Sequence, residues 1–182
     1  MRSRATSLLN LVLIWLALVG GEGLAQQTAP SEYQIKAAFI FNFAKFVDWP
    51  PSAFSNLNSP IVIGILGDNP FHDDLARTIH NKTIEDRPLV IEELRVPSEA
   101  TNCHILFISS SEKDRLPEIL KSLKDTSVLT VGEMDHFTES GGMINLVIRD
   151  QKIRFQINNG EATKARLKIS SKLMNLALRP GG

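Results

Sequence analysis

The sequence predicts an α/β protein with a mixed, mainly parallel β-sheet flanked by helices and an antiparallel hairpin at one edge. Between residues 61 and 131, short apolar, β-branched segments alternate with segments of helical periodicity, which is typical of a parallel sheet. Farther along, the apolar segments 143–148 and 153–157 flank the polar sequence Arg149-Asp150-Gln151-Lys152. This pattern is typical of an antiparallel hairpin, which would add the last strands to one edge of the sheet.

The individual elements follow from local patterns. A helix is expected over residues 33–48, where four apolar side chains fall on one helical face and prolines follow Trp49. We interpret this face as core, and the alternative is that part of the helix contacts a partner. The apolar side chains of that face are Ile35, Phe39, Phe43 and Phe46, and Ile40 and Phe41 widen it. The other predicted strands are 61–66, 88–94, 103–108 and 128–131, and the other predicted helices are 71–80, 111–124 and one that starts at Ser170-Ser171.

The first 25 residues have the order of a secretory signal peptide. A basic start precedes an apolar core over residues 8–19, and small residues precede Gln26. This core is shorter than the roughly 20 apolar residues that span a membrane, so we expect cleavage near Ala25 and an exported protein. The remainder is predicted to be a short flexible lead, residues 26–31, and a single domain, residues 32–180.

Charge and cysteine content restrict the class of partner and the means of stabilisation. The chain has 20 Lys and Arg residues against 20 Asp and Glu residues and no lysine-rich tract, which argues against a nucleic-acid partner. Cys103 is the single cysteine, so we expect no internal disulfide and a protein held together by its apolar core. Because its strand is predicted to be buried, we expect the Cys103 thiol to be inert.

Motifs that would indicate catalysis are not found in the sequence. It contains no G-x-S-x-G nucleophile elbow, no phosphate-binding or dinucleotide-binding glycine loop, and no H-x-x-x-H pair for zinc. Cys103 and His104 are neighbours on a predicted strand and would point to opposite faces, so one metal ion would not bind both. We therefore predict no catalytic residue, no cofactor and no metal site.

A ligand or partner pocket is expected where the parallel strands end, because open α/β sheets bind ligands beyond the carboxyl ends of their strands. Those ends carry small or polar residues, which suit the floor of a pocket and are equally typical of ordinary turns between strands and helices. Lys45 is added as an exposed residue of the first helix. The candidate residues are Lys45, Asp68, Ser109, Ser110 and Glu133.

Several segments, read together and in order, resemble the YfiR-like family of periplasmic regulators. The resemblance covers about residues 32–178, after the signal peptide. One departure concerns redox chemistry: Cys103 resembles one member of a disulfide pair in the family, and its partner would fall near Gly64, where this chain has no thiol. The segments that carry the resemblance are 33–50, 65–71, 103–109, 129–133, 141–144 and 169–173.

The resemblance implies a non-enzymatic periplasmic protein with a mixed sheet flanked by helices. It implies a repressor that acts on the periplasmic sensor domain of an inner-membrane diguanylate cyclase, with an outer-membrane lipoprotein as a further partner and with dimer formation known in the family. Our leading hypothesis is therefore a periplasmic regulatory binding protein in cyclic di-GMP signalling and biofilm formation. The alternative is a periplasmic small-molecule sensor; an exported hydrolase is disfavoured because no nucleophile and base were identified.

Overall fold

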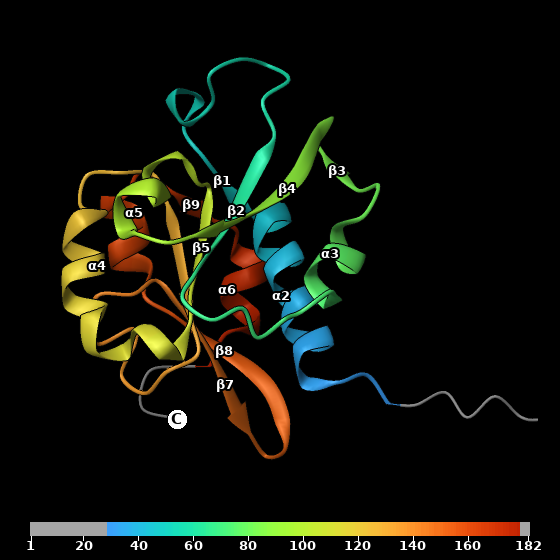
Figure 1. Cartoon of the computed structure of the whole chain (residues 1–182), viewed down its shortest axis with the longest axis vertical. Helices are drawn as coiled ribbons and strands as arrows, with labels where there is room; N and C mark the ends of the chain where they lie inside the picture. The colour runs from blue at the N-terminus through green and yellow to red at the C-terminus, as the bar shows by residue number, and fades with distance from the viewer. Residues whose placement is uncertain (1–28, 179–182) are drawn as a thin grey trace, which may run out of the picture.

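The computed structural model describes residues 29–178 (Figure 1), so the predicted signal peptide lies outside the described residues. The helices are α2 (Glu32–Phe46), α3 (Asp74–Ile79), α4 (Leu116–Ser122), α5 (Asn159–Lys164) and α6 (Ser171–Leu176), with 3₁₀ turns η1 (Pro51–Ala53), η2 (Pro97–Asn102) and η3 (Ser110–Arg115). The strands are β1 (Val47–Asp48), β2 (Ile61–Leu66), β3 (Thr83–Ile84), β4 (Arg87–Leu94), β5 (Ile105–Ile108), β6 (Leu129–Gly132), β7 (Ile144–Arg149), β8 (Lys152–Ile157) and β9 (Lys168–Ile169).

The main sheet has seven strands in the order β3-β4-β2-β5-β6-β7-β8. Strands β4, β2, β5, β6 and β7 are parallel, whereas β8 pairs antiparallel to β7 and β3 pairs antiparallel to β4. The predicted mixed, mainly parallel sheet with an antiparallel hairpin at one edge is therefore confirmed. A separate pair, β1 with β9, was not predicted.

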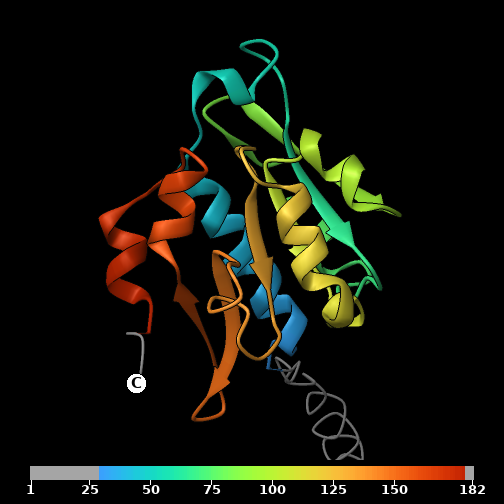
Figure 2. The same cartoon turned by 90° about the vertical axis from the view of Figure 1, so that its left-hand side faces the viewer.

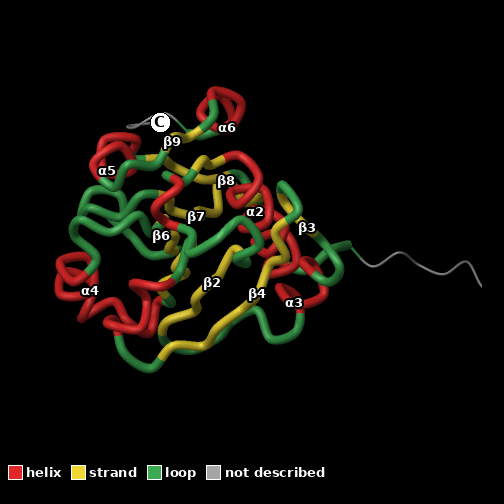
Figure 3. The backbone as a smooth tube through the Cα atoms, turned by 90° about the horizontal axis from the view of Figure 1, so that it is seen from above, coloured by secondary structure: helices red, strands yellow, loops and turns green. Residues whose placement is uncertain are grey.

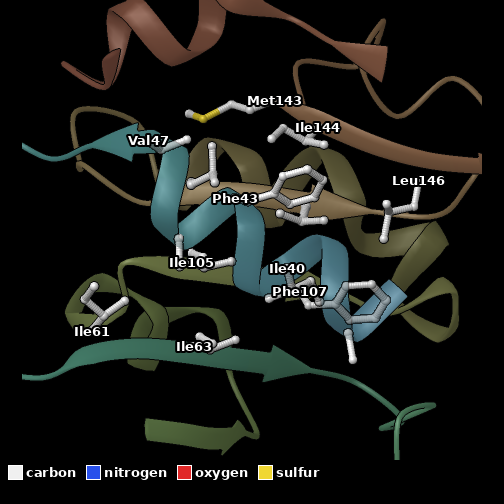
Figure 4. Close-up of a cluster of buried hydrophobic side chains, with 14 of the residues drawn as sticks. Ile40, Phe43, Val47, Ile61, Ile63, Ile105, Phe107, Met143, Ile144 and Leu146 are labelled. Carbon is white, nitrogen blue, oxygen red and sulfur yellow. The ribbon is translucent and has the colours of Figure 1, made fainter. Parts of the chain in front are cut away.

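The central strands are buried on both faces, because helices cover the sheet from two sides (Figure 3). Side chains alternate between two apolar clusters along each strand, as the period of a β-strand requires. In β5, Ile105 and Phe107 join the cluster that contains α2 (Figure 4). Leu106 and Ile108 join the cluster that contains α4. Such double burial explains why these strands are continuous apolar segments in the sequence.

Helix α2 is the main element on its face of the sheet, and Ser31 starts it with a capping box that includes Gln34. Its buried side overlaps the predicted one: Phe43 and Ile40 are fully buried, and Phe39 and Phe46 are partly buried against the core, whereas Ile35 is not part of the core cluster. The buried side chains are Lys36, Ala37, Ile40, Phe43 and Ala44. The helix also ends at Phe46, before the predicted end, because the next two residues pair with β9.

Other details also differ from the prediction: β3 was not predicted, and β5 begins at Ile105, so Cys103 and His104 precede this strand. The helix expected over 111–124 begins as the 3₁₀ turn η3, and regular α-helix starts only at Leu116, with Pro117 in its first turn. Helix α5 was not predicted, because Ala162 is its only buried side chain and it has no apolar periodicity. Among residues 29–178, no helix is long and apolar enough to span a membrane.

Candidate functional site

The carboxyl ends of the central strands lie at one edge of the sheet in exact register. Leu66 of β2 pairs with Ile108 of β5, Ile108 pairs with Gly132 of β6, and Gly132 pairs with Asn145 of β7. The residues that follow β2, β5 and β6 therefore leave the sheet side by side. This is the edge at which open α/β sheets bind their ligands.

A buried ion pair joins this edge to the first helix. The ammonium of Lys36 donates to Oε2 of Glu133 at 2.5 Å and also to Oε1 of Glu32. The side chains of Lys36 and Glu133 are only 5% and 7% exposed, whereas that of Glu32 is 42% exposed. Burial alone lowers the pKa of Lys36, but the hydrogen bonds to Glu133 and Glu32 outweigh it and raise the pKa above its ordinary value.

Tyr33 completes this arrangement. Its hydroxyl donates to Oε1 of Glu133 at 3.2 Å, and the ammonium of Lys36 lies 4.7 Å from the centre of its ring. Burial and the carboxylate of Glu133 raise the pKa of Tyr33, so the phenol remains a hydrogen-bond donor. Both oxygens of Glu133 are thus satisfied, and the start of α2 is fixed against the end of β6.

A hollow of about 360 Å³ lies beside this pair, and we call it the carboxyl-edge hollow. Its lining comes from the start of α2 (Glu32, Tyr33, Lys36), from Ser110, from residues 133–135 and from residues 145–148. The lining carries three carboxylates, on Glu32, Glu133 and Asp135, against the single ammonium of Lys36. The hollow is therefore acidic and favours a positively charged group.

The structure places the predicted pocket residues in different surroundings. Glu133 and Ser110 both line the carboxyl-edge hollow. Asp68 and Ser109 lie at the same edge but hold turns: the Asp68 N–H donates to the Ser111 hydroxyl at 3.0 Å, and Ser109 is buried as the N-cap of η3. Lys45 lies near the other end of α2 and lines a separate hollow with Trp49 and Arg87.

Sequence reasoning missed Lys36 and Tyr33, which contact Glu133 directly. Lys36 lies three and four residues from Tyr33 and Ile40, within a helix rich in aromatic side chains. A single lysine on the apolar side of such a helix is a signal for a buried ion pair, since a buried charge is paired. Its partner could not be identified, because Glu133 is 97 residues away in the sequence.

A second buried polar residue, His104, lies at the opposite edge of the sheet. Its Nδ1 accepts a hydrogen bond from the Val62 N–H at 3.1 Å, so the neutral ring carries its hydrogen on Nε2. The Trp49 indole donates to the His104 carbonyl at 3.1 Å, and the Phe54 ring stacks on the imidazole at 4.5 Å. Burial lowers the pKa of His104, which keeps the ring neutral.

Cys103 is buried, as predicted, and its thiol is free. Burial raises the pKa of its thiol to about 12. A Cβ placed on Gly64 would come within 2.6 Å of the Cys103 sulfur, so these two positions are in direct contact. Within residues 29–178, no group of three or more His, Cys, Asp and Glu side chains is arranged to hold a metal ion.

The fold and the hollow together define an α/β protein with an acidic crevice at the carboxyl edge of its sheet. Comparison with protein families gives a match to the YfiR/HmsC-like family over residues 33–178, nearly the whole described chain. The chain therefore belongs to the YfiR/HmsC-like family, which is a regulatory family. This match confirms the resemblance seen in the sequence. Comparison with curated protein sequences gives no match.

Proposed function

We propose that this protein is a periplasmic regulator that modulates a membrane-bound diguanylate cyclase through the periplasmic sensor domain of that enzyme. The observation that carries the proposal is the family match over residues 33–178. The predicted signal peptide supports export, and the resemblance of the sequence to periplasmic regulators supports repression as the direction of control. A protein of this kind acts by binding one state of its partner more tightly than the other.

The carboxyl edge of the sheet supports a binding role. The ion pair between Lys36 and Glu133 fixes the start of α2, so the surface around the hollow is pre-formed. Next to it, Ile148 is 60% exposed although it is a large apolar side chain. A fixed surface that combines charge with an exposed apolar residue is suited to contact another protein.

The proposal is tested by removing the gene and measuring cyclic di-GMP while the cognate cyclase is expressed. We expect cyclic di-GMP and biofilm formation to rise, and the intact gene supplied in trans to restore them. As a control, a copy without residues 1–25 should fail to restore them, because the product would not reach the periplasm. Unchanged cyclic di-GMP in the deletion strain would contradict the proposal.

A small-molecule sensor is the second candidate, and a groove between α4 and α5 favours it. The groove has a volume of about 680 Å³, and its lining carries Lys121, Lys124 and Lys164 against Asp125 and Glu161, of which Glu161 pairs with Lys164. Such a groove suits a small anionic ligand with an apolar part. Thermal unfolding in the presence of candidate ligands is the measurement: a rise in Tm that is lost in Lys121→Ala would favour the sensor.

A further inference from the structure

Strand β7 extends beyond its neighbour β6. The two strands pair only at Val131 with Ile144 and at Gly132 with Asn145, and β6 ends there. On its other side, β7 pairs with β8 along its whole length, up to Arg149. The β7–β8 hairpin therefore projects past the end of β6 (Figures 1 and 2), and one edge of β7 continues without a neighbouring strand among the described residues.

The hydrogen-bond pattern shows which backbone groups face this edge. The Asn158 N–H donates to the Met143 carbonyl at 2.8 Å, in the same register as the β7–β8 ladder. In an antiparallel ladder the bonded pairs alternate, so Asn145 and Val147 point their N–H and C=O groups toward β8. Leu146 and Ile148 then point theirs in the opposite direction.

The other strand of the hairpin agrees with this assignment. The Phe155 carbonyl, opposite Leu146, accepts from the Leu178 N–H at 2.8 Å and therefore faces away from β7. Ile148 lies beyond the end of β6, and within residues 29–178 no backbone or side-chain group bonds its N–H or C=O on the open side. Unpaired groups of this kind form a template for another strand.

The surroundings of the open edge have a definite chemistry. The carboxyl-edge hollow runs beside residues 145–148 and provides space next to the edge. Glu32, Glu133 and Asp135 make this space acidic. Ile148, which is 60% exposed, offers an apolar surface at the same place.

We propose that residues 146–148 of β7 bind an extended, basic segment of a partner protein by strand addition. The backbone of that segment pairs with Ile148, a Lys or Arg side chain enters the acidic hollow, and an apolar side chain packs on Ile148. The inference goes beyond the proposed function, because it holds whether or not the partner is a cyclase. A second copy of this chain fits the edge less well, since pairing two β7 edges would bring two acidic hollows together.

The test uses the protein from Gln26 onward and synthetic eight-residue peptides that alternate valine with lysine or valine with glutamate. Binding is followed by NMR through the backbone amide signals of the protein. We expect the lysine peptide to shift the Leu146 and Ile148 amides, and the glutamate peptide to bind at least about tenfold more weakly. A lysine peptide with N-methylated backbone amides should not bind, because it lacks the donors of a strand.

Two variants of the protein separate backbone pairing from side-chain contact. Ile148→Pro removes the N–H at the open edge and no bond of the β7–β8 ladder, so the fold should persist and affinity should fall at least about tenfold. Ile148→Thr keeps the N–H and should retain most of the affinity. The N-methylated peptide provides the same comparison without any change to the protein, should Ile148→Pro fail to fold.

Three results would overturn the inference. The first is that the Ile148 amide does not respond to millimolar lysine peptide. The second is that the N-methylated peptide or the Ile148→Pro protein binds as tightly as its parent. The third is a dimer in sedimentation experiments that Ile148→Pro abolishes, which would show that a second copy occupies the edge. Failure of the gene deletion to raise cyclic di-GMP would leave these measurements unaffected.

Discussion

Glu133→Gln is expected to destabilise the protein by about 3 kcal/mol, because it leaves the ammonium of Lys36 buried with only a half-exposed partner. At the 2.5 Å that separates Lys36 Nζ from Glu133 Oε2, two unit charges attract by roughly 7 kcal/mol in an effective dielectric of about 20. Removing the two charged groups from water costs several kcal/mol per ion, and this cost offsets the attraction. The intact pair is therefore worth little on balance, but breaking it is costly.

The measurement is urea unfolding at pH 7, followed by the fluorescence of Trp49, which is the only tryptophan from Gln26 onward. The matched control is Glu32→Gln, which removes the exposed partner of the same ammonium and should cost no more than about 1 kcal/mol. A cost for Glu133→Gln below about 1 kcal/mol, equal to that of Glu32→Gln, would refute this account of the pair.

The dependence on pH follows from the raised pKa of Lys36. A group whose pKa is higher in the folded protein contributes stability that is fully present below its ordinary pKa, here 10.5. This contribution is lost only as the pH rises through the raised value. As the pH rises from neutral, the difference between the parent protein and Lys36→Met should therefore stay constant and change only in strongly alkaline solution.

Three further predictions concern the opposite edge of the sheet. Because burial raises the pKa of Cys103 to about 12, maleimide should label the native protein at least about a hundredfold more slowly than the protein unfolded in urea, and equal rates would contradict its burial. Gly64→Ala should lower the free energy of unfolding by about 1–3 kcal/mol, since its Cβ would lie 2.6 Å from the Cys103 sulfur. Adding Cys103→Ala to this variant should recover part of the lost stability. An unchanged free energy of unfolding in Gly64→Ala would exclude the contact. Because burial lowers the pKa of His104, the free energy of unfolding should fall as the pH drops below 6.5. His104→Gln should weaken this dependence on pH. If the free energy of unfolding of His104→Gln falls as steeply with pH as that of the parent, other groups are responsible for the dependence.

Strands that are buried on both faces could be predicted closely. The range 61–66 coincides with β2, because six consecutive apolar or glycine residues leave no side for solvent. The hairpin was also found, since its polar turn separates two apolar segments. In both cases the information is local, so the sequence alone carries it.

The elements that depend on distant partners could not be predicted in this way. Strand β1 has only two residues and exists because it pairs with β9, more than a hundred residues later. The burial of Lys36 on α2 was missed for the same reason. The aromatic side chains indicated the core face, but Lys36 is buried as well because it pairs with Glu133, which is 97 residues away in the sequence.

The candidate site was likewise predicted only as far as the local sequence determines it. The rule that ligands bind at carboxyl ends of strands led to Ser110 and Glu133, which do share a hollow. It also led to Asp68, whose backbone N–H bonds the Ser111 hydroxyl, and to Ser109, whose side chain caps η3. A strand end alone does not distinguish these uses, because the outcome depends on which helix packs against it.

The effects of the carboxyl edge on stability and on recognition can be tested separately. Glu133 contributes to stability through its ion pair with Lys36, whereas the net charge of the hollow contributes to peptide binding. In Lys36→Met/Glu133→Gln both charges of the pair disappear, so the net charge of the hollow is unchanged and the buried ammonium is gone. This protein should recover most of the stability lost in Glu133→Gln, since apolar replacement of a buried pair is often neutral. It should also bind the lysine peptide as the parent does.

Asp135→Asn is the complementary change, because Asp135 is exposed and forms no ion pair among the described residues. It should leave urea unfolding within about 0.5 kcal/mol of the parent and weaken binding of the lysine peptide several-fold. If instead the double variant loses the peptide while Asp135→Asn keeps it, the ion pair itself is the recognition element. The open edge of β7 would then act only together with the buried lysine.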